Sequence, residues 1–377
     1  MTLHIFNPEH DIALAANLSN FTAPRAGRQL RHDLAFLPAL WAKEGDSVLV
    51  DDMEYAERQW EDVCSQMERY GLSPVFPLGI HRILLRNTSY SPLEYDRVEP
   101  WGWDSALCSM LKRHGFNEQL LPTDEQLQRI RALSHRRTAA QLLPLLQQPG
   151  TVGEAFECST VDEVQALLQC YGQLMLKAPW SSSGRGVRLL TMDNGQWTMG
   201  NGHLTMDKWV RNVLQAQGNV MAEPYYQKVM DLGMEFTALE NGTIRYDGLS
   251  LFDTRNGAYT GNLLATENKK REIISRYIPV CLVDSIQQKI TKELRLDGYC
   301  GPLGVDMMIV ENQGNGQCPE GGKYLLHPCV EINVRRTMGH VALSLTPPTD
   351  DQLLTMSIAY DGSHYLFNIK EQENVTT

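Results

Sequence analysis

A lysine followed by a loop of serines and glycines is the first feature of the sequence that could do chemistry. Lys177 ends a short apolar run, and the loop after it consists of Ser181, Ser182, Ser183, Gly184, Arg185 and Gly186. Glycine and serine let backbone N–H groups approach phosphate oxygens closely, and lysine adds a mobile positive charge. The spacing is not GxxxxGK[ST], so Walker-type and dinucleotide-binding loops both fit poorly. The alternative is an ordinary exposed hairpin turn.

A second feature places a carboxylate, an amide and a guanidinium two residues apart. Glu331, Asn333 and Arg335 would share one face of a strand, while Ile332 and Val334 would be buried on the other. Carboxylate and amide oxygens suit Mg²⁺, and arginine suits a phosphate. An exposed face of an amphipathic strand is the alternative, although Glu and Asn are poor strand residues.

A third feature is a single carboxylate inside an apolar strand. Asp306 stands in the segment Gly-Val-Asp-Met-Met-Ile-Val, where a buried carboxylate needs a cation or hydrogen-bond donors. One predicted hairpin separates it from Glu331 and Asn333, and antiparallel pairing would gather all three around Mg²⁺. A structural hydrogen bond of Asp306 is the alternative.

A fourth feature is a pair of acidic residues at neighbouring strand ends. Glu223 follows the apolar residues 220–222, and Glu235 opens the next predicted strand. Such an arrangement can form an adenine slot with a carboxylate for ribose hydroxyls. Two ordinary strand ends are the alternative.

Alternating strand and helix signals must position these groups, and they favour α/β architecture. Strands are predicted at 3–6, 47–50 and 74–77, and helices at 30–43 and 54–70, which together indicate a small N-terminal α/β domain.

Three local signals mark elements farther along the chain. Thr160 and Glu163 match a capping box at a helix start, and Asn241-Gly242 predicts a hairpin turn. Asp284 is predicted to cap a further helix.

Composition limits the class of protein. The 377 residues include 34 Lys and Arg against 45 Asp and Glu, a formal net charge of −11, which argues against nucleic acid as a partner. No run approaches the ~20 apolar residues of a membrane span, and no secretory signal is recognisable. The eight cysteines contain no CxxC pair and are typical of reduced thiols. A cytoplasmic protein is therefore expected.

Taken in chain order, the four features resemble the ATP-grasp superfamily over about residues 120–345. Lys177 with the 181–186 loop is similar to the lysine and flexible phosphate-covering loop of that superfamily. Glu223 resembles its hinge carboxylate, and Glu235 the acidic residue often found near ribose.

The metal-binding strand carries the rest of the resemblance. Glu331, Asn333 and Arg335 match the pattern E-x-N-x-R, with Asp306 as the further metal ligand. Many members have a second lysine in the first subdomain. Here Arg136 or Arg137 stands in the equivalent stretch, and Arg136 is assigned to the nucleotide site.

The resemblance implies an α/β (α+β) chain in which two α+β subdomains grip ATP behind a small α/β N-terminal domain. The expected boundaries are 1–120 for the substrate-side N-terminal domain, 121–218 for the first subdomain and 219–377 for the second subdomain with the metal site. Residues 311–323 are long for the hairpin between the metal strands, and their role as decoration, lid or oligomer contact stays open.

The activity implied is an ATP-dependent, ADP-forming carbon–nitrogen ligase that uses Mg²⁺, or Mn²⁺ in its place. A small-molecule carboxylate would form an acyl phosphate, and an amine or peptide would displace the phosphate. Lys177 and Arg335 are assigned to catalysis. The alternatives are an ATP-grasp phosphotransferase and a nucleotide-binding protein without turnover. No nucleic acid or membrane partner is expected, and a homo-oligomer is compatible with the sequence.

The N-terminal domain offers weaker candidates for substrate recognition. Asn7, Glu9, His10 and Asp11 follow the first predicted strand, where α/β folds often bind ligands, although a polar loop with a helix cap is the simpler interpretation. Trp180 is expected to pack rather than to stack on a ligand.

Overall fold

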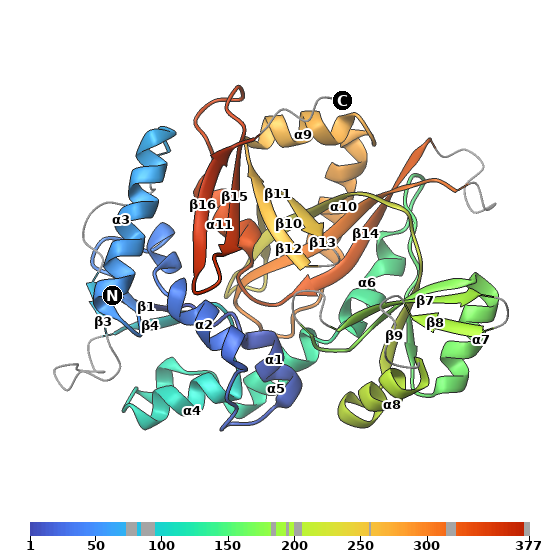
Figure 1. Cartoon of the computed structure of the whole chain (residues 1–377), viewed down its shortest axis with the longest axis horizontal. Helices are drawn as coiled ribbons and strands as arrows, with labels where there is room; N and C mark the ends of the chain where they lie inside the picture. The colour runs from blue at the N-terminus through green and yellow to red at the C-terminus, as the bar shows by residue number, and fades with distance from the viewer. Residues whose placement is uncertain are drawn as a thin grey trace.

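The chain contains three β-sheets with helices packed against them (Figure 1). The structure, a computed structural model, describes residues 1–72, 81–83, 95–181, 186–193, 196–199, 206–255, 258–313 and 322–372. The strand predicted at 74–77, residues 182–185 of the predicted loop and most of 311–323 lie outside the described residues. Parallel and antiparallel sheets occur in separate parts of the chain, so the prediction of an α+β fold is confirmed.

The first sheet is parallel and belongs to the N-terminal part of the chain. Its strands, in the order β3-β2-β1-β4, are β1 (Thr2–Ile5), β2 (Ser47–Leu49), β3 (His81–Ile83) and β4 (Arg97–Pro100). Its helices are α1 (His10–Ala16), α2 (Arg25–Asp33), α3 (Met53–Arg69) and α4 (Ser105–Arg113). The 3₁₀ turn Glu118–Leu120 and α5 (Asp124–Leu133) then lead away from this sheet.

The helix predicted at 30–43 is wrong in its bounds. Helix α2 ends at Asp33, and a separate 3₁₀ turn covers Leu37–Leu40. Pro38 stands in that turn, and proline cannot supply the backbone N–H that a continuing helix needs. Apolar residues at helical spacing therefore serve two short elements here, not one long helix.

The second sheet is antiparallel and has five strands in the order β5-β9-β6-β7-β8. The strands are β5 (Phe156–Cys158), β6 (Gln173–Lys177), β7 (Val187–Asp193), β8 (Gln196–Met199) and β9 (Val220–Pro224). Its helices are α7 (Val161–Tyr171) and α8 (Met206–Gln217). The predicted capping box is confirmed, because Thr160 and Glu163 satisfy each other's backbone N–H groups at the start of α7.

The third sheet has seven antiparallel strands in the order β14-β13-β10-β11-β12-β15-β16. They are β10 (Lys228–Ala238), β11 (Ile244–Arg255), β12 (Ala258–Leu264), β13 (Gly301–Glu311), β14 (Tyr324–Asn333), β15 (Leu354–Tyr360) and β16 (Tyr365–Glu371). The predicted Asn241-Gly242 turn joins β10 to β11, with Gly242 at a φ of +80°.

Helices α6 (Arg137–Leu146), α9 (Glu267–Ser275) and α10 (Val280–Glu293) contribute to the apolar core on one face of this sheet. The predicted cap at Asp284 is wrong, because α10 begins directly after Pro279 and Asp284 lies inside it, bonded to Arg271 at 2.5 Å. Pro279 is the N-cap residue and makes no cap hydrogen bond, and proline is tolerated at a helix start because its missing N–H is not needed there.

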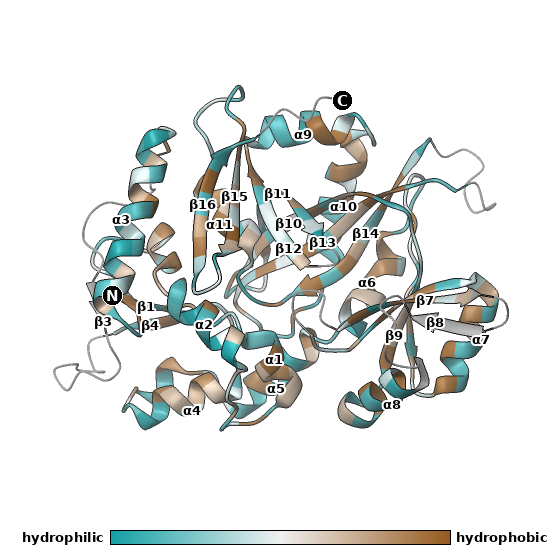
Figure 2. Cartoon of the chain, viewed as in Figure 1, coloured by the Kyte–Doolittle hydropathy of each residue, from teal (hydrophilic) through white to brown (hydrophobic). Residues whose placement is uncertain are grey.

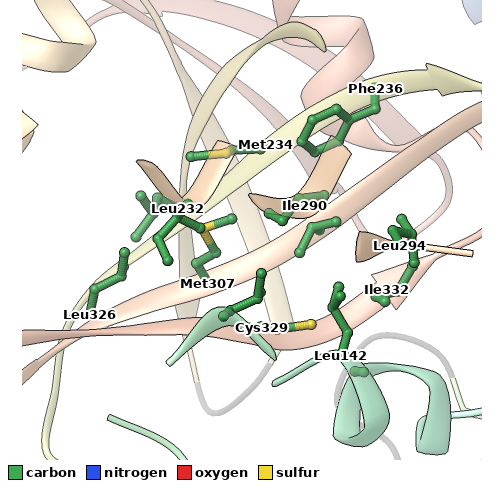
Figure 3. Packing of buried hydrophobic residues seen from close by; sticks show 14 of the residues in the cluster. Leu142, Leu232, Met234, Phe236, Ile290, Leu294, Met307, Leu326, Cys329 and Ile332 are labelled. Carbon is green, nitrogen blue, oxygen red and sulfur yellow. The ribbon is translucent and has the colours of Figure 1, made fainter. Parts of the chain in front are cut away.

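The largest apolar core lies on one face of the seven-stranded sheet. Figure 3 shows Met234, Phe236, Met307 and Ile332 of this face among the side chains of the cluster. Figure 2 shows the same segregation as brown stretches along the strands and on the inner sides of α6 and α10. The apolar face fixes the register of β10, β13 and β14, because a one-residue slip would turn its side chains to the other face.

A second core joins the N-terminal part to the end of the chain. Strands β15 and β16 and helix α11 (Met338–Ser344) contribute to one apolar cluster with α3 and the 3₁₀ turn 37–40. Figure 1 shows α3 beside β16, on the side of the molecule away from α7 and α8. The N-terminal sheet and the seven-stranded sheet are therefore packed together through a shared core.

Among the helices of the described ranges, none combines the length and apolar character needed to cross a membrane.

Candidate active site

Four polar side chains share the face of the seven-stranded sheet opposite the apolar core. In the register of β10, β13 and β14, Asp306 lies opposite Glu331, while Gly304 lies between Glu235 and Asn333. Directly opposed residues of antiparallel strands point to the same side, so these side chains form one polar patch. The sequence predicted this face for Glu331 and Asn333 from their spacing and proposed that hairpin pairing would add Asp306.

Asp306 is surrounded by negative charge. The Asn333 side-chain amide donates to its Oδ2 at 2.9 Å, while the Glu331 and Glu235 carboxylates lie close enough to act on it. Burial, and then these two carboxylates, raise the pKa of Asp306 to about 8. A carboxylate in such a position gains from a nearby cation, because a cation offsets both the burial and the repulsion.

Lys177 reaches this region from the five-stranded sheet. Its Nζ donates to Glu223 Oε2 at 2.6 Å and lies 3.5 Å from the backbone oxygen of Val330 on β14. Each side chain of the ion pair is only 8% exposed. The two sheets therefore meet at this lysine, beside the strand that carries Glu331.

Arg136, at the start of α6, makes an ion pair with Glu331 of β14. Its Nη2 lies 2.8 Å from Glu331 Oε1, and its Nη1 donates to Ala178 O at 2.6 Å and to Ser181 Oγ at 2.8 Å. Arg137 instead points outward to Glu157. Of the two arginines that the sequence offered for the missing lysine, the structure thus places Arg136 in the cluster.

The predicted phosphate loop is described only at its two ends. Ser181 contacts Arg136 as above, and the backbone oxygen of Gly186 accepts from the Ala178 N–H at 2.8 Å. A Cβ on Gly186 would lie 2.4 Å from the Ser181 side chain, so only glycine fits this close approach. The predictions for Ser182, Ser183, Gly184 and Arg185 lie outside the described residues.

Arg335 is held by the N-terminal helix α1. Its Nε and Nη2 donate to the two carboxylate oxygens of Asp11 at 2.9 and 2.8 Å, a bidentate pair. Burial alone would raise the pKa of Asp11, but the guanidinium of Arg335 outweighs it and holds that pKa below its usual range. Asp11, one of the weaker sequence candidates, is thus brought to the metal strand.

Of the other N-terminal candidates, Asn7 and Glu9 have hydrogen-bond partners, whereas the buried His10 ring has none among the described residues and its Nδ1 lies 3.6 Å from an Asp104 oxygen. The Asn7 side-chain amide donates to the backbone oxygen of Gly102 at 2.8 Å, and Arg31 donates to Glu9 at 2.5 Å. These contacts hold the chain after β1 in place and leave Asp11 as the residue facing the sheet.

Glu235 lies deeper in the cluster than its predicted ribose role suggests. Its Oε2 accepts from the Thr337 hydroxyl at 2.8 Å and lies 3.1 Å from His340 Nδ1. A Cβ on Gly339 would come within 1.9 Å of Oε1, so the first turn of α11 packs directly against this carboxylate. Sequence reasoning missed Thr337 and His340, although their capping-box spacing at the start of α11 was available as a signal.

Trp180 packs, as predicted, but it also borders the site. Its indole N–H donates to the backbone oxygen of Arg131 at 2.9 Å, and the Arg131 guanidinium lies 3.8 Å from the ring centroid. A pocket beside it is formed by α1, the 180–181 turn and the end of β14. Its lining consists of Asp11, Leu14, Ser134, Trp180, Ser181, Glu331, Ile332, Asn333 and Val334.

A divalent cation would find oxygen donors on the polar patch. Within the described residues no three His, Cys, Asp or Glu side chains form a metal-binding group. The predicted set has another composition, two carboxylates and one amide, and hard cations such as Mg²⁺ are commonly held by few protein oxygens together with phosphate and water. Asp306, Glu331 and Asn333 therefore fit this cation by donor type and by their shared face.

Comparison with known proteins gives structural matches only. No family model and no curated protein matches the chain. Among solved structures, it is similar to N5-carboxyaminoimidazole synthetase from Staphylococcus aureus complexed with ADP, with 12% identity over 85% of this chain and 84% of that one and a TM-score of 0.43. It is also similar to a biotin carboxylase complex from Campylobacter jejuni, with 13% identity, 97% and 77% coverage and a TM-score of 0.48.

A third match is a putative ATP-grasp superfamily protein from Archaeoglobus fulgidus, with 10% identity, 99% and 100% coverage and a TM-score of 0.42. The solved structures similar to this chain are thus ATP-grasp proteins, the superfamily that its motifs resemble. With such identities and TM-scores below 0.5, the likeness transfers no residue role and no reaction to this chain.

Proposed function

We propose that this chain binds Mg·ATP between its five- and seven-stranded sheets and uses it to join a carboxylate to an amine, releasing ADP and phosphate. One observation carries the proposal. Two cationic side chains, Lys177 of β6 and Arg136 at the start of α6, meet the carboxylate-rich face of β13 and β14, where Asp306 and Glu331 oppose each other.

The ion pairs of this cluster are suited to a charged ligand that carries both signs. Lys177 and Arg136 would exchange Glu223 and Glu331 for the phosphate oxygens of ATP. Glu331, Asp306 and Asn333 would then be free to hold Mg²⁺, whose charge offsets that of the phosphates. Lys177, Arg136 and Glu331 would thus each have a partner of opposite charge both with and without the nucleotide.

Arg335 is the residue that we assign to the reacting groups. It is rigid, because Asp11 holds two of its nitrogens, and it lies two residues beyond Asn333. A fixed guanidinium stabilises charge that develops on a phosphoryl or carbonyl oxygen during transfer. Lys177 supplies the second fixed positive charge, as expected for a reaction in which both reactants are anions.

We propose a ligase, and an ATP-grasp phosphotransferase with the same motifs is the alternative that the experiment below distinguishes. The substrates proposed are a small-molecule carboxylate, which forms an acyl phosphate, and an amine or peptide that displaces the phosphate.

Phosphate release measured with ATP, Mg²⁺ and pooled carboxylates and amines tests the proposal. We expect release that requires both a carboxylate and an amine and that is lost in the double variant Glu331→Gln, Asn333→Ala. Glu311→Gln is the matched control, because Glu311 is exposed at the far end of the same strand as Asp306. Release that needs no amine would indicate a phosphotransferase, and release unchanged in the double variant would refute the site.

A further inference from the structure

Arg336 lies in surroundings quite unlike those of its neighbour Arg335. Its guanidinium carbon lies 4.4 Å from the centroid of the Trp41 ring, and its backbone N–H donates to the Trp101 oxygen at 2.9 Å. Trp41 follows the 3₁₀ turn of the N-terminal part, and Trp101 follows β4. Arg336 therefore lies at the seam between the N-terminal unit and the seven-stranded sheet.

Two hydrogen-bond donors at this seam have no acceptor. Throughout the described part of the chain, the Arg336 guanidinium makes no hydrogen bond and no ion pair, although the residue is half-buried. The indole nitrogen of Trp41, on the ring beneath it, is buried and also has no partner among those residues. The Trp41 N–H is thus removed from water without an acceptor, which destabilises a structure, and the half-buried guanidinium above the ring adds five N–H donors.

The acidic residues around Arg336 are bound to other groups. Glu99 pairs with Arg97 at 3.1 Å and lies 3.7 Å from His4. Asp247 pairs with Arg245 at 2.7 Å. These carboxylates act on Arg336 only from a distance, so none of them serves as its counter-ion.

The comparison with Arg335 shows what a partner would change. Arg335 is also buried, but the Asp11 carboxylate raises its pKa. Burial lowers the pKa of Arg336, because no contacting anion offsets the loss of water. Arg335 and Arg336, which follow β14, thus differ in the presence of a bound carboxylate.

We propose that the Arg336 guanidinium and the Trp41 indole N–H form a subsite for an oxyanion, a carboxylate or phosphate group of the acceptor substrate. That the oxyanion belongs to the acceptor substrate rests on the proposed function. The subsite itself rests only on the surroundings of Arg336 and Trp41. Two N–H-rich groups side by side suit an oxyanion with several lone pairs, and the indole ring supports the planar guanidinium from one face.

Direct binding of two simple probes, inorganic phosphate and succinate, tests the subsite. Each is titrated calorimetrically into the full chain with a non-hydrolysable ATP analogue and Mg²⁺ in excess, so that the proposed nucleotide site is filled. We expect at least one probe to bind the wild type, and Arg336→Met to weaken it by about tenfold or more, as for loss of a charge-assisted contact. Trp41→Phe, which keeps the ring but not the N–H, should weaken it by about threefold.

The variants separate this inference from its alternatives. Arg276→Met removes one exposed positive charge on α9 and should leave probe affinity within about twofold of wild type. Arg336→Lys keeps the positive charge but not the planar guanidinium. It replaces Arg336→Met in the binding test if the melting temperature of Arg336→Met is far below that of wild type. Failure of both probes to bind, or equal binding to wild type and the Arg336 variants, would overturn the subsite. Failure of the ATP analogue alone to bind would refute the proposed function instead.

Discussion

The seven-stranded sheet and the segments that face it at the candidate site differ in the charge they bring. Lys177 of β6 comes paired with Glu223 of β9, and Arg136 comes from the start of α6; both cations also lie near backbone oxygens. The seven-stranded sheet brings Asp306, Glu331 and Glu235, with Asn333 as the neutral member. These charges already pair with one another in the absence of a ligand. In the proposed complex the two cations would bind the phosphates of ATP, and the carboxylates would bind Mg²⁺.

The acidic side should be the more sensitive of the two. Asp306→Asn keeps the size of the side chain but removes the carboxyl group that would ionise when a cation binds between the two other carboxylates. We expect ATP-dependent phosphate release to fall by roughly 10²–10³-fold, the usual loss for one electrostatic group of an active site. The fold should be retained, since the wild-type pKa of about 8 already favours a protonated side chain at neutral pH. Steady-state phosphate release measures the effect, and an activity within threefold of wild type would contradict the assignment.

On the cationic side, stability and binding can be separated. Lys177→Met leaves the Glu223 carboxylate buried without its partner, which should lower the free energy of unfolding by about 3 kcal/mol. Adding Glu223→Gln should recover most of that loss in urea denaturation, because no unpaired charge remains. ATP affinity should stay weak in both variants. Recovery of ATP affinity in the double variant would show that Lys177 acts on Glu223 only.

His327, on β14 of the seven-stranded sheet, lies close enough to Lys177 for that positive charge to affect its pKa. Its ring on β14 is fully buried, and burial, followed by the charge of Lys177, lowers its pKa to about 3. Between pH 6.5 and 3 the unfolded chain therefore binds a proton that the folded chain does not, so stability falls as the pH falls through this range.

The measurement compares His327→Gln with wild type by denaturation at several pH values. Wild type should lose about 1.6 kcal/mol more than the variant between pH 6.5 and 5, because the unfolded histidine is half protonated at pH 6.5 and almost fully protonated at pH 5. His114→Gln, on an exposed helix end, is the control and should titrate like wild type. Parallel curves for His327→Gln and wild type would rule out this source of acid sensitivity.

The smallest effect is expected where the N-terminal helix touches the site. Asp11→Asn breaks the bidentate pair with Arg335, whose side chains are 18% and 17% exposed. A loss of about 1–2 kcal/mol in unfolding free energy is expected for this charge-assisted contact. Activity should fall through poorer positioning of Arg335, with ATP affinity retained. An equal fall in ATP affinity would place Asp11 in the nucleotide site itself.

The sequence was most informative where the period of a strand decides the outcome. Glu331 and Asn333 are two residues apart, so their common face followed from strand geometry alone, and the apolar residues between them indicated which face is buried. The Asn241-Gly242 turn and the Thr160 capping box were equally local, and the structure contains both.

Contacts between distant segments could not be predicted in this way. Asp11 and Arg335 are 324 positions apart, and Glu235 finds Thr337 102 positions away. These pairs depend on how α1 and the loop after β14 pack against the sheet, which no local pattern specifies. The same limit explains the 30–43 helix, where Pro38 and the packing of separate short elements outweighed apolar spacing.

Calorimetric titration of ATP into the wild-type chain, with and without Mg²⁺, tests the central claim most directly. We expect Mg²⁺ to raise the affinity of the wild-type chain for ATP. The double variant Glu331→Gln, Asn333→Ala should lose this rise in affinity, whereas Glu311→Gln should keep it. Equal affinity with and without Mg²⁺ in wild type, or an undiminished gain in the double variant, would contradict the claim that this face of β13 and β14 holds the metal–nucleotide pair.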